Sequence, residues 1–101
     1  MLWLDDQFDQ EDISFRHPPI GFIPAKTSKE AIAFTERFGV PEFISFDHDL
    51  GENDNAMKYI DWLIENHYEN NVPGFQVHSA NPVGKANIIS KMNSWKKSQS
   101  L

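Results

Sequence analysis

Residues 43–51 read FISFDHDLG, an apolar run that ends abruptly in three ionisable side chains. The stretch Glu42–Phe46 is typical of a buried strand, and Asp47, His48 and Asp49 follow it directly. Charged groups are costly to bury without partners, so a purely structural strand end would normally space them apart or expose them. The stretch therefore predicts a strand whose end carries a functional site.

Two further stretches repeat this pattern. Met1–Leu4 is a short apolar strand that leads directly into Asp5 and Asp6, and Phe75–His78 is a strand that leads into Ser79. Side chains at the carboxyl ends of parallel strands meet in one crevice. Three polar strand ends in one small chain therefore predict a single shared site.

Helices alternate with these strands. A capping box at Thr27–Glu30 opens a helix that ends at Gly39. A second helix follows the turn Gly51–Asn55 and ends near Asn70, and a third begins with an Asn-Pro pair after the last strand. With a short edge strand at Gly21–Pro24, the order is β, β, α, β, α, β, α, which predicts an α/β sandwich with a mostly parallel sheet.

Apolar residues at helical spacing predict the buried face of each helix. The chain is expected to fray after Lys96. The predicted buried positions are Ala31, Phe34 and Phe38 in the first helix, Met57, Ile60 and Ile64 in the second, and Ile88, Met92 and Trp95 in the third.

Length and composition are those of one soluble globular domain over residues 1–101. Hydrophobic residues make up 40% and charged residues 24%, and the absence of cysteine excludes disulfides, thiolate zinc sites and thiol nucleophiles. The net charge of −6 argues against broad binding to a nucleic-acid backbone, which needs clustered Lys and Arg. The N-terminus shows neither a signal sequence nor a membrane span, so we expect a cytoplasmic protein.

The acidic residues at the strand ends suit a divalent cation. Asp47 and Asp49 could share a face if the strand continues past Phe46. Together with Asp5 or Asp6 they would form an oxygen-rich pocket suited to Mg²⁺ or Mn²⁺. Structural explanations stay open, namely an Asx turn at Asp5 and Asp6 and a turn cap at Asp49.

The segment HSANPVG, residues 78–84, is the most specific in the chain. Asn81 suits the N-cap of the last helix, and this explanation needs no function. The same geometry leaves N–H groups around Val83 and Gly84 where a phosphate could bind, with Ser79 as a further donor. Gly84 would also let a ligand approach the backbone closely. The segment therefore predicts an anion site.

Two histidines and one arginine are candidates for the chemistry. His78 lies beside the predicted anion site, which makes it the first candidate for general acid-base catalysis, with His48 as its partner. A single histidine at a strand end is more often structural than catalytic, but two of them on either side of an anion site shift the balance toward catalysis. Arg16 could reach an anion from the loop Gln7–Pro19, which is predicted to be a binding loop or lid, although a solvated arginine is the simpler interpretation.

The motifs LWLDD, DHDLG and HSANPVG, in this order and over nearly the whole chain, resemble the cyclic-phosphate processing family of receiver-like domains found in bacteria and phages. The resemblance implies a receiver- or flavodoxin-like three-layer sandwich, with about four mostly parallel strands in the order 2-1-3-4 and three helices. The family usually has an Arg shortly after the Asp pair, where this chain has Gln7, Phe8 and Asp9. The resemblance carries the family's polar positions over to Asp5, Asp6, Asp47, His48, Asp49, His78, Ser79 and Asn81.

Three functions follow as hypotheses. The first is hydrolysis of a cyclic phosphate, either a nucleotide 2′,3′-cyclic phosphate at an RNA end or a cyclic (oligo)nucleotide signal, with His78, His48 and Asp47 as catalytic residues. The second is a protein that sequesters a cyclic nucleotide without cleaving it, as a phage protein countering host immune signalling would. The third is a degenerate receiver that serves as an interaction module. The sequestering protein would use the same pocket, with the loop Gln7–Pro19 as a lid and a dimer to enclose a symmetric ligand. The expected protein is a monomer or a homodimer in a bacterial or phage-infected cell.

Overall fold

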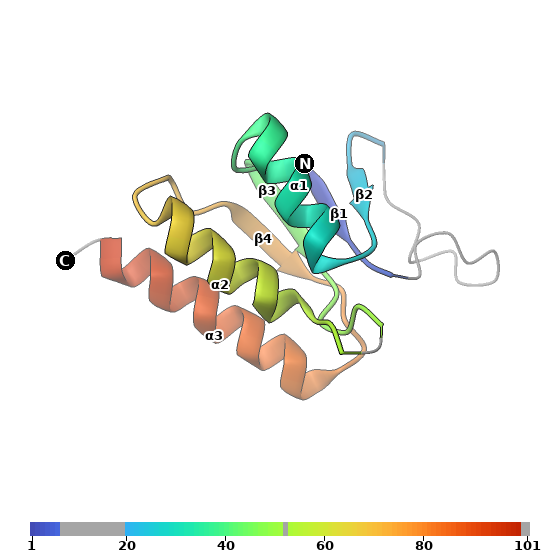
Figure 1. Ribbon diagram of the computed structural model, residues 1–101. Coiled ribbons are helices and arrows are strands. Elements are labelled where there is room, and N and C mark those ends of the chain that lie inside the picture. Colours follow the sequence, from blue (N-terminus) through green and yellow to red (C-terminus); the bar gives the residue numbers. More distant parts are fainter. Residues whose placement is uncertain (7–19, 52, 100–101) are drawn as a thin grey trace.

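The computed structural model describes residues 1–6, 20–51 and 53–99 of the chain. Within these residues, four short strands and three helices alternate (Figure 1). In chain order they are β1 (Leu2–Leu4), β2 (Ile23–Ala25), α1 (Ser28–Phe38), β3 (Phe43–Phe46), α2 (Ala56–His67), β4 (Gly74–Val77) and α3 (Pro82–Gln99). The predicted order of strands and helices is confirmed.

The four strands form one parallel sheet in the order β2-β1-β3-β4. This is the receiver-like order that the family resemblance implied. In the register, Trp3 of β1 lies opposite Ser45 of β3, and Ser45 lies opposite Gln76 of β4. Residues that are aligned in this way point to the same face of a sheet, so these three side chains form one row.

All three helices pack against one face of the sheet (Figure 1). The crossovers from β2 to β3 and from β3 to β4 run in the same direction across the sheet, and right-handed crossovers then place α1 and α2 on one side. The described residues therefore form two layers, and the third layer of the expected sandwich is not found among them. The connection that runs the other way, from β1 to β2, contains residues 7–19, which lie outside the described ranges. The core combines Leu2, Leu4, Ile44 and Phe46 of the sheet with Ala31, Ile60, Leu63, Ile88, Met92 and Trp95 of the helices.

The helix boundaries follow from capping. Thr27 accepts a hydrogen bond from the N–H of Glu30 at 3.0 Å, and Gly39 closes α1 with a φ of 89°, as predicted. The second helix ends earlier than expected, at His67, and the third continues to Gln99 rather than fraying after its tryptophan. No helix in the described part of the chain is both long and apolar enough to cross a lipid bilayer.

The buried faces of α1 and α2 differ from the predicted ones, whereas that of α3 is confirmed. Phe38 is 65% exposed, and Thr35 takes a buried position on α1 instead. On α2, Tyr59 is fully buried, while Met57 and Ile64 are only partly buried. The hydroxyls of Thr35 and Tyr59 form a buried hydrogen bond of 2.7 Å, which satisfies both polar atoms and allows both side chains to be buried. A prediction based only on the spacing of apolar residues does not include such a pair.

The hydrogen-bond ladder of the sheet continues one residue beyond the strands. Asp5, Asp47 and His78 each donate their backbone N–H to a carbonyl of the neighbouring strand, at 3.0, 2.8 and 2.9 Å. The alternation of side chains therefore continues too, and all three lie on the face opposite the helices. They form the row next to Trp3 and Ser45 at the carboxyl end of the sheet.

The buried Thr35–Tyr59 pair generates a stability prediction. Tyr59→Phe keeps the ring and removes the hydroxyl, so it should lower the free energy of unfolding by about 1 kcal/mol in urea denaturation near neutral pH. Burial raises the pKa of Tyr59 above its ordinary value, to about 12. The native protein should therefore lose stability as the pH rises from 10 toward 12, because the unfolded state releases this proton first.

The phenylalanine variant should lack this part of the alkaline destabilisation. Tyr68→Phe is the matched control, because its hydroxyl bonds Ser98 at the exposed surface, and its effect should stay within about 0.5 kcal/mol. Equal effects of the two substitutions would contradict the assignment of Tyr59 to the core.

Candidate functional site

A polar pocket of about 300 Å³ lies at the carboxyl end of the sheet. Its lining comes from the segments that follow β1, β3 and β4, which are the three polar strand ends expected to meet. Three of its side chains are carboxylates, and no Lys or Arg of the described residues lines it. The lining residues are Asp6, Asp47, Asp49, Gly51, Ser79, Ala80 and Asn81.

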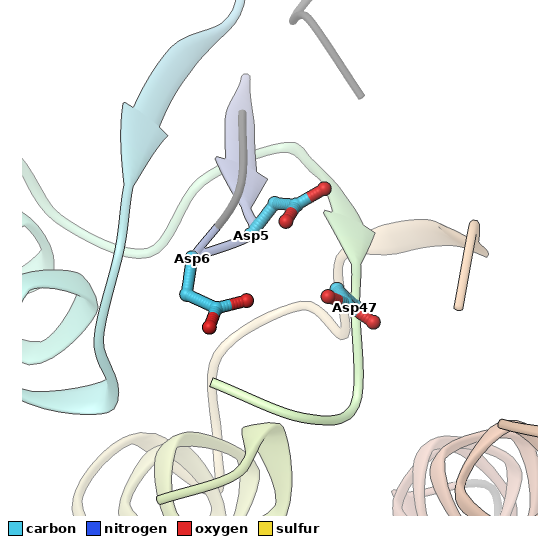
Figure 2. Close-up of side chains that lie close together, drawn as sticks. All are labelled: Asp5, Asp6 and Asp47. Carbon is cyan, nitrogen blue, oxygen red and sulfur yellow. The ribbon is translucent and has the colours of Figure 1, made fainter. Parts of the chain in front are cut away.

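Three carboxylates converge beside this pocket. One oxygen from each of Asp5, Asp6 and Asp47 lies within 4.8 Å of the others. Figure 2 shows Asp5 and Asp6 at the end of β1 and Asp47 at the end of β3. Asp5 is fully buried, and Asp47 is only 4% exposed. Because like charges this close repel and are poorly hydrated, the group suits a divalent cation, and all-oxygen donors are those that Mg²⁺ and Mn²⁺ prefer.

Asp49 lines the pocket but lies outside this carboxylate group. The chain turns away from the sheet after β3, so Asp47 and Asp49 do not continue one strand face. The Asp49 side chain is 64% exposed. Its carboxylate accepts hydrogen bonds from His48 Nδ1 at 3.0 Å and from Asn81 Nδ2 at 3.1 Å. These bonds lower the pKa of Asp49, so the group is an anionic hydrogen-bond acceptor at the pocket wall.

His78 is bound to the sheet and does not line the pocket. Its Nε2 lies 3.0 Å from Asp5 Oδ2, and its Nδ1 lies 2.8 Å from Ser45 Oγ. Its ring stacks on the indole of Trp3, with ring centroids 4.2 Å apart and an interplanar angle of 10°. Both ring nitrogens thus have protein partners. The geometry connects His78 to a carboxylate of the cluster rather than to the predicted anion site.

His48 occupies the space beside Gly84. A Cβ atom built on Gly84 would lie 2.3 Å from Cγ of the His48 ring, far inside contact distance. The N–H of Gly84 donates to Asn81 Oδ1 at 3.0 Å, which is the N-cap bond of α3. The glycine is therefore explained by the packing of a histidine ring and by capping. The ligand approach that the sequence suggested there would meet the His48 ring.

Asn81 and Ser79 join the end of β4 to the pocket. Asn81 caps α3 as predicted, and its own N–H donates to Ser79 Oγ at 3.1 Å. Both side chains line the pocket, whereas Val83 and Gly84 do not. Val83 is 68% exposed at the start of the helix. The predicted position of Arg16 and of the lid loop falls outside the described residues.

The turn that carries Gly51 is anchored to α1. The Asp54 carboxylate accepts bonds from the N–H of Ser28 at 2.9 Å and from its hydroxyl at 2.6 Å. Gly51 has a φ of 92°, a left-handed conformation that glycine adopts without strain. The wall of the pocket formed by this turn is therefore fixed to the layer of helices.

Sequence reasoning missed Ser45, Gln76 and Trp3, which contact or support His78. Gln76 Nε2 donates to Ser45 Oγ at 3.0 Å, and Ser45 is fully buried. Strand alternation would have placed Ser45 on the same face as Asp47, and Trp3 on the same face as Asp5. That Ser45 and Trp3 contact His78, and that Gln76 contacts Ser45, depended on the register, which the sequence did not specify.

Comparison with known proteins gives one finding about the family. The model of the family described as "Cyclic-phosphate processing Receiver domain" matches residues 1–94. No curated protein and no solved structure gives a significant match.

The contact between His48 and Gly84 can be tested by stability. Gly84→Ala should lower the free energy of unfolding by roughly 1–3 kcal/mol, because the added methyl group overlaps the His48 ring. In a His48→Ala background the overlap is gone, and the same substitution should raise stability by up to about 1 kcal/mol, since alanine favours a helix over glycine.

The neighbouring exposed position provides the control for this cycle. Lys85→Ala should be nearly neutral in both backgrounds. The explanation of Gly84 is wrong if Gly84→Ala is equally stabilising with and without His48.

Proposed function

The chain belongs to the cyclic-phosphate processing receiver domain family, and we propose that it binds a cyclic phosphate through a divalent cation and hydrolyses it. The observation that carries this proposal is the approach of Asp5, Asp6 and Asp47 to within 4.8 Å of one another beside a polar pocket. The substrate class is a nucleotide 2′,3′-cyclic phosphate, at an RNA end or free, or a cyclic (oligo)nucleotide. Both contain a phosphodiester that is part of a ring, and each such phosphate carries one negative charge.

The acidic lining of the pocket suits a cation. Asp6, Asp47 and Asp49 line it, and no lysine or arginine of the described residues is part of that lining. A phosphate anion entering such a pocket is repelled at short range. A Mg²⁺ or Mn²⁺ ion held by Asp5, Asp6 and Asp47 would offset most of their negative charge, present a positive centre to the phosphate oxygens and polarise the bound phosphate.

The other pocket residues supply orientation. The hydroxyl of Ser79 and the side-chain amide of Asn81 are neutral donors on the wall, suited to the non-bridging phosphate oxygens. The carboxylate of Asp49 is an acceptor that can orient an attacking water. In the reaction, the water oxygen adds to phosphorus, one ring P–O bond breaks, and the leaving oxygen takes up a proton. The cyclic diester becomes a monoester with a new hydroxyl group.

The roles of the two histidines change under this proposal. His78 acts through Asp5, to which its Nε2 is bound, and not directly on the substrate. His48 holds Asp49 from one side and packs against Gly84 on the other. The acid-base role first expected for His78 would require one ring nitrogen to leave Ser45 or Asp5.

Sequestration without cleavage is the second candidate function. The observation that favours it is the same engagement of both His78 nitrogens, which leaves this imidazole no nitrogen directed at a ligand. It uses the same pocket and the same cation. The difference lies in whether the phosphorus–oxygen bond breaks.

Phosphorus NMR separates these functions. Purified protein is mixed with 2′,3′-cyclic nucleotides and with cyclic di- and oligonucleotides, in Mg²⁺ and in excess chelator. Under hydrolysis, a cyclic resonance is replaced by that of a phosphomonoester only when the cation is present. Under sequestration, the resonance shifts or broadens, and intact ligand returns on denaturation. No change with any compound in the panel would contradict both and favour an interaction module.

The cation site has a readout that does not depend on turnover. The unmodified protein should bind Mn²⁺ in a calorimetric titration, and Asp47→Asn should weaken this affinity by more than about tenfold, since even outer groups of a metal site contribute that much. Asp61→Asn is the matched control, because Asp61 is an exposed acid on α2 that pairs with Lys91. Equal Mn²⁺ affinity of the two variants would contradict the assignment of the cluster.

A further inference from the structure

A chain of hydrogen bonds runs across the helix-free face of the sheet and ends on the carboxylate cluster. Gln76 Nε2 lies 3.0 Å from Ser45 Oγ, and Ser45 Oγ lies 2.8 Å from His78 Nδ1. His78 Nε2 lies 3.0 Å from Asp5 Oδ2. This hydrogen-bond chain therefore runs from Gln76 on β4 to Ser45 on β3, back to His78 at the end of β4, and on to Asp5 at the end of β1.

The donors and acceptors give this chain a single direction. An amide nitrogen can only donate, so Gln76 donates to the oxygen of Ser45. The carboxylate of Asp5 can only accept, so the proton of the neutral imidazole sits on Nε2 and is donated to Asp5. Nδ1 of that ring is then an acceptor, and the hydroxyl of Ser45 donates to it.

Ser45 lies in the middle of the row that supports His78. Trp3, Ser45 and Gln76 form one row across the sheet. The hydroxyl of Ser45 reaches Nδ1 of His78 at 2.8 Å, while the face of the same ring stacks on Trp3 with centroids 4.2 Å apart. The stacking fixes the plane of the ring, and the two hydrogen bonds fix its rotation within that plane.

We propose that Ser45 and Gln76 are positioning residues of the cation site, which act through His78 to hold the Asp5 carboxylate in one orientation. The inference rests on the proposed role of Asp5 as a cation ligand. Ligating carboxylates in metal sites are generally held by such outer hydrogen bonds, and losing one typically costs 10- to 100-fold in metal affinity. Asp5 is fully buried, so a rotated carboxylate could not regain this bond from water.

The first test reads the tautomer of His78 in the cation-free protein. Long-range ¹H–¹⁵N NMR spectra of histidine-labelled protein distinguish a protonated from an unprotonated ring nitrogen. The unmodified protein should show the proton of His78 on Nε2. In Gln76→Glu the new carboxylate accepts from Ser45, so the serine hydroxyl no longer donates to Nδ1, and the pure Nε2–H signature should be lost. A proton on Nδ1 in the neutral ring of the unmodified protein overturns the proposed direction of the chain.

The second test reads the effect on the cation site. Ser45→Ala removes the hydroxyl with little change of volume and should weaken Mn²⁺ binding about 10- to 100-fold. Ser90→Ala, at an exposed position of α3, is the matched control and should bind Mn²⁺ as the unmodified protein does. Circular dichroism of the cation-free variants shows whether each is folded. A folded Ser45→Ala protein whose Mn²⁺ affinity stays within twofold of the unmodified one overturns the inference.

The two tests separate this inference from the proposed function. If the unmodified protein binds Mn²⁺ and Ser45→Ala weakens that binding, the positioning role is supported even where no cyclic phosphate is cleaved. If the unmodified protein binds no Mn²⁺, the proposed function is overturned, and the positioning of a cation ligand falls with it. The His78 tautomer then decides by itself whether the hydrogen-bond chain to Asp5 exists.

Discussion

The register of the parallel sheet is the constraint on which the site depends. The register of β1, β3 and β4 aligns the residues that directly follow these strands. Asp5, Asp47 and His78 therefore lie side by side in one row across the sheet. A shift of one residue in β3 would turn Asp47 toward the helices and Phe46 away from them. That shift would bury a charge in the apolar core. The hydrophobic pattern of the strands and the geometry of the site therefore select the same register.

The carboxylate cluster brings three like charges together at the carboxyl end of the sheet. Elsewhere in the described residues, polar groups have partners and apolar groups are packed together: α1 is capped at both ends, the buried hydroxyls of Thr35 and Tyr59 bond each other, and the apolar side chains form one core. Asp5 and Asp47 are almost inaccessible and close to a third acid, Asp6. Like charges in such a position oppose folding unless another charge balances them. A conflict of this kind is expected at functional sites, where the sequence is selected for more than stability.

Much of the fold follows from the sequence, because its signals are local. The strands are apolar runs, the capping of α1 is a four-residue pattern, and the strand order agrees with the family resemblance. The failures concern contacts between distant residues. The burial of Thr35 depends on a hydroxyl 24 residues away, and the partners of His78 are 33 and 73 residues away. No local pattern encodes these pairs, so the hydrogen bonds that link Gln76 and Ser45 to His78 were not predicted.

The motif HSANPVG illustrates how one short segment can serve several parts of a site. His78 is directed to Asp5 on the sheet face, while Ser79 and Asn81 line the pocket. Gly84, one turn later, accommodates the ring of His48 from another strand end. The motif thus fixes the positions of groups contributed by β1 and β3 as well as its own. Both nitrogens of the His78 ring are hydrogen-bonded, and one face of the ring stacks on Trp3, so no ring nitrogen is directed at the pocket. These contacts favour a role in orienting the Asp5 carboxylate over proton transfer to a ligand.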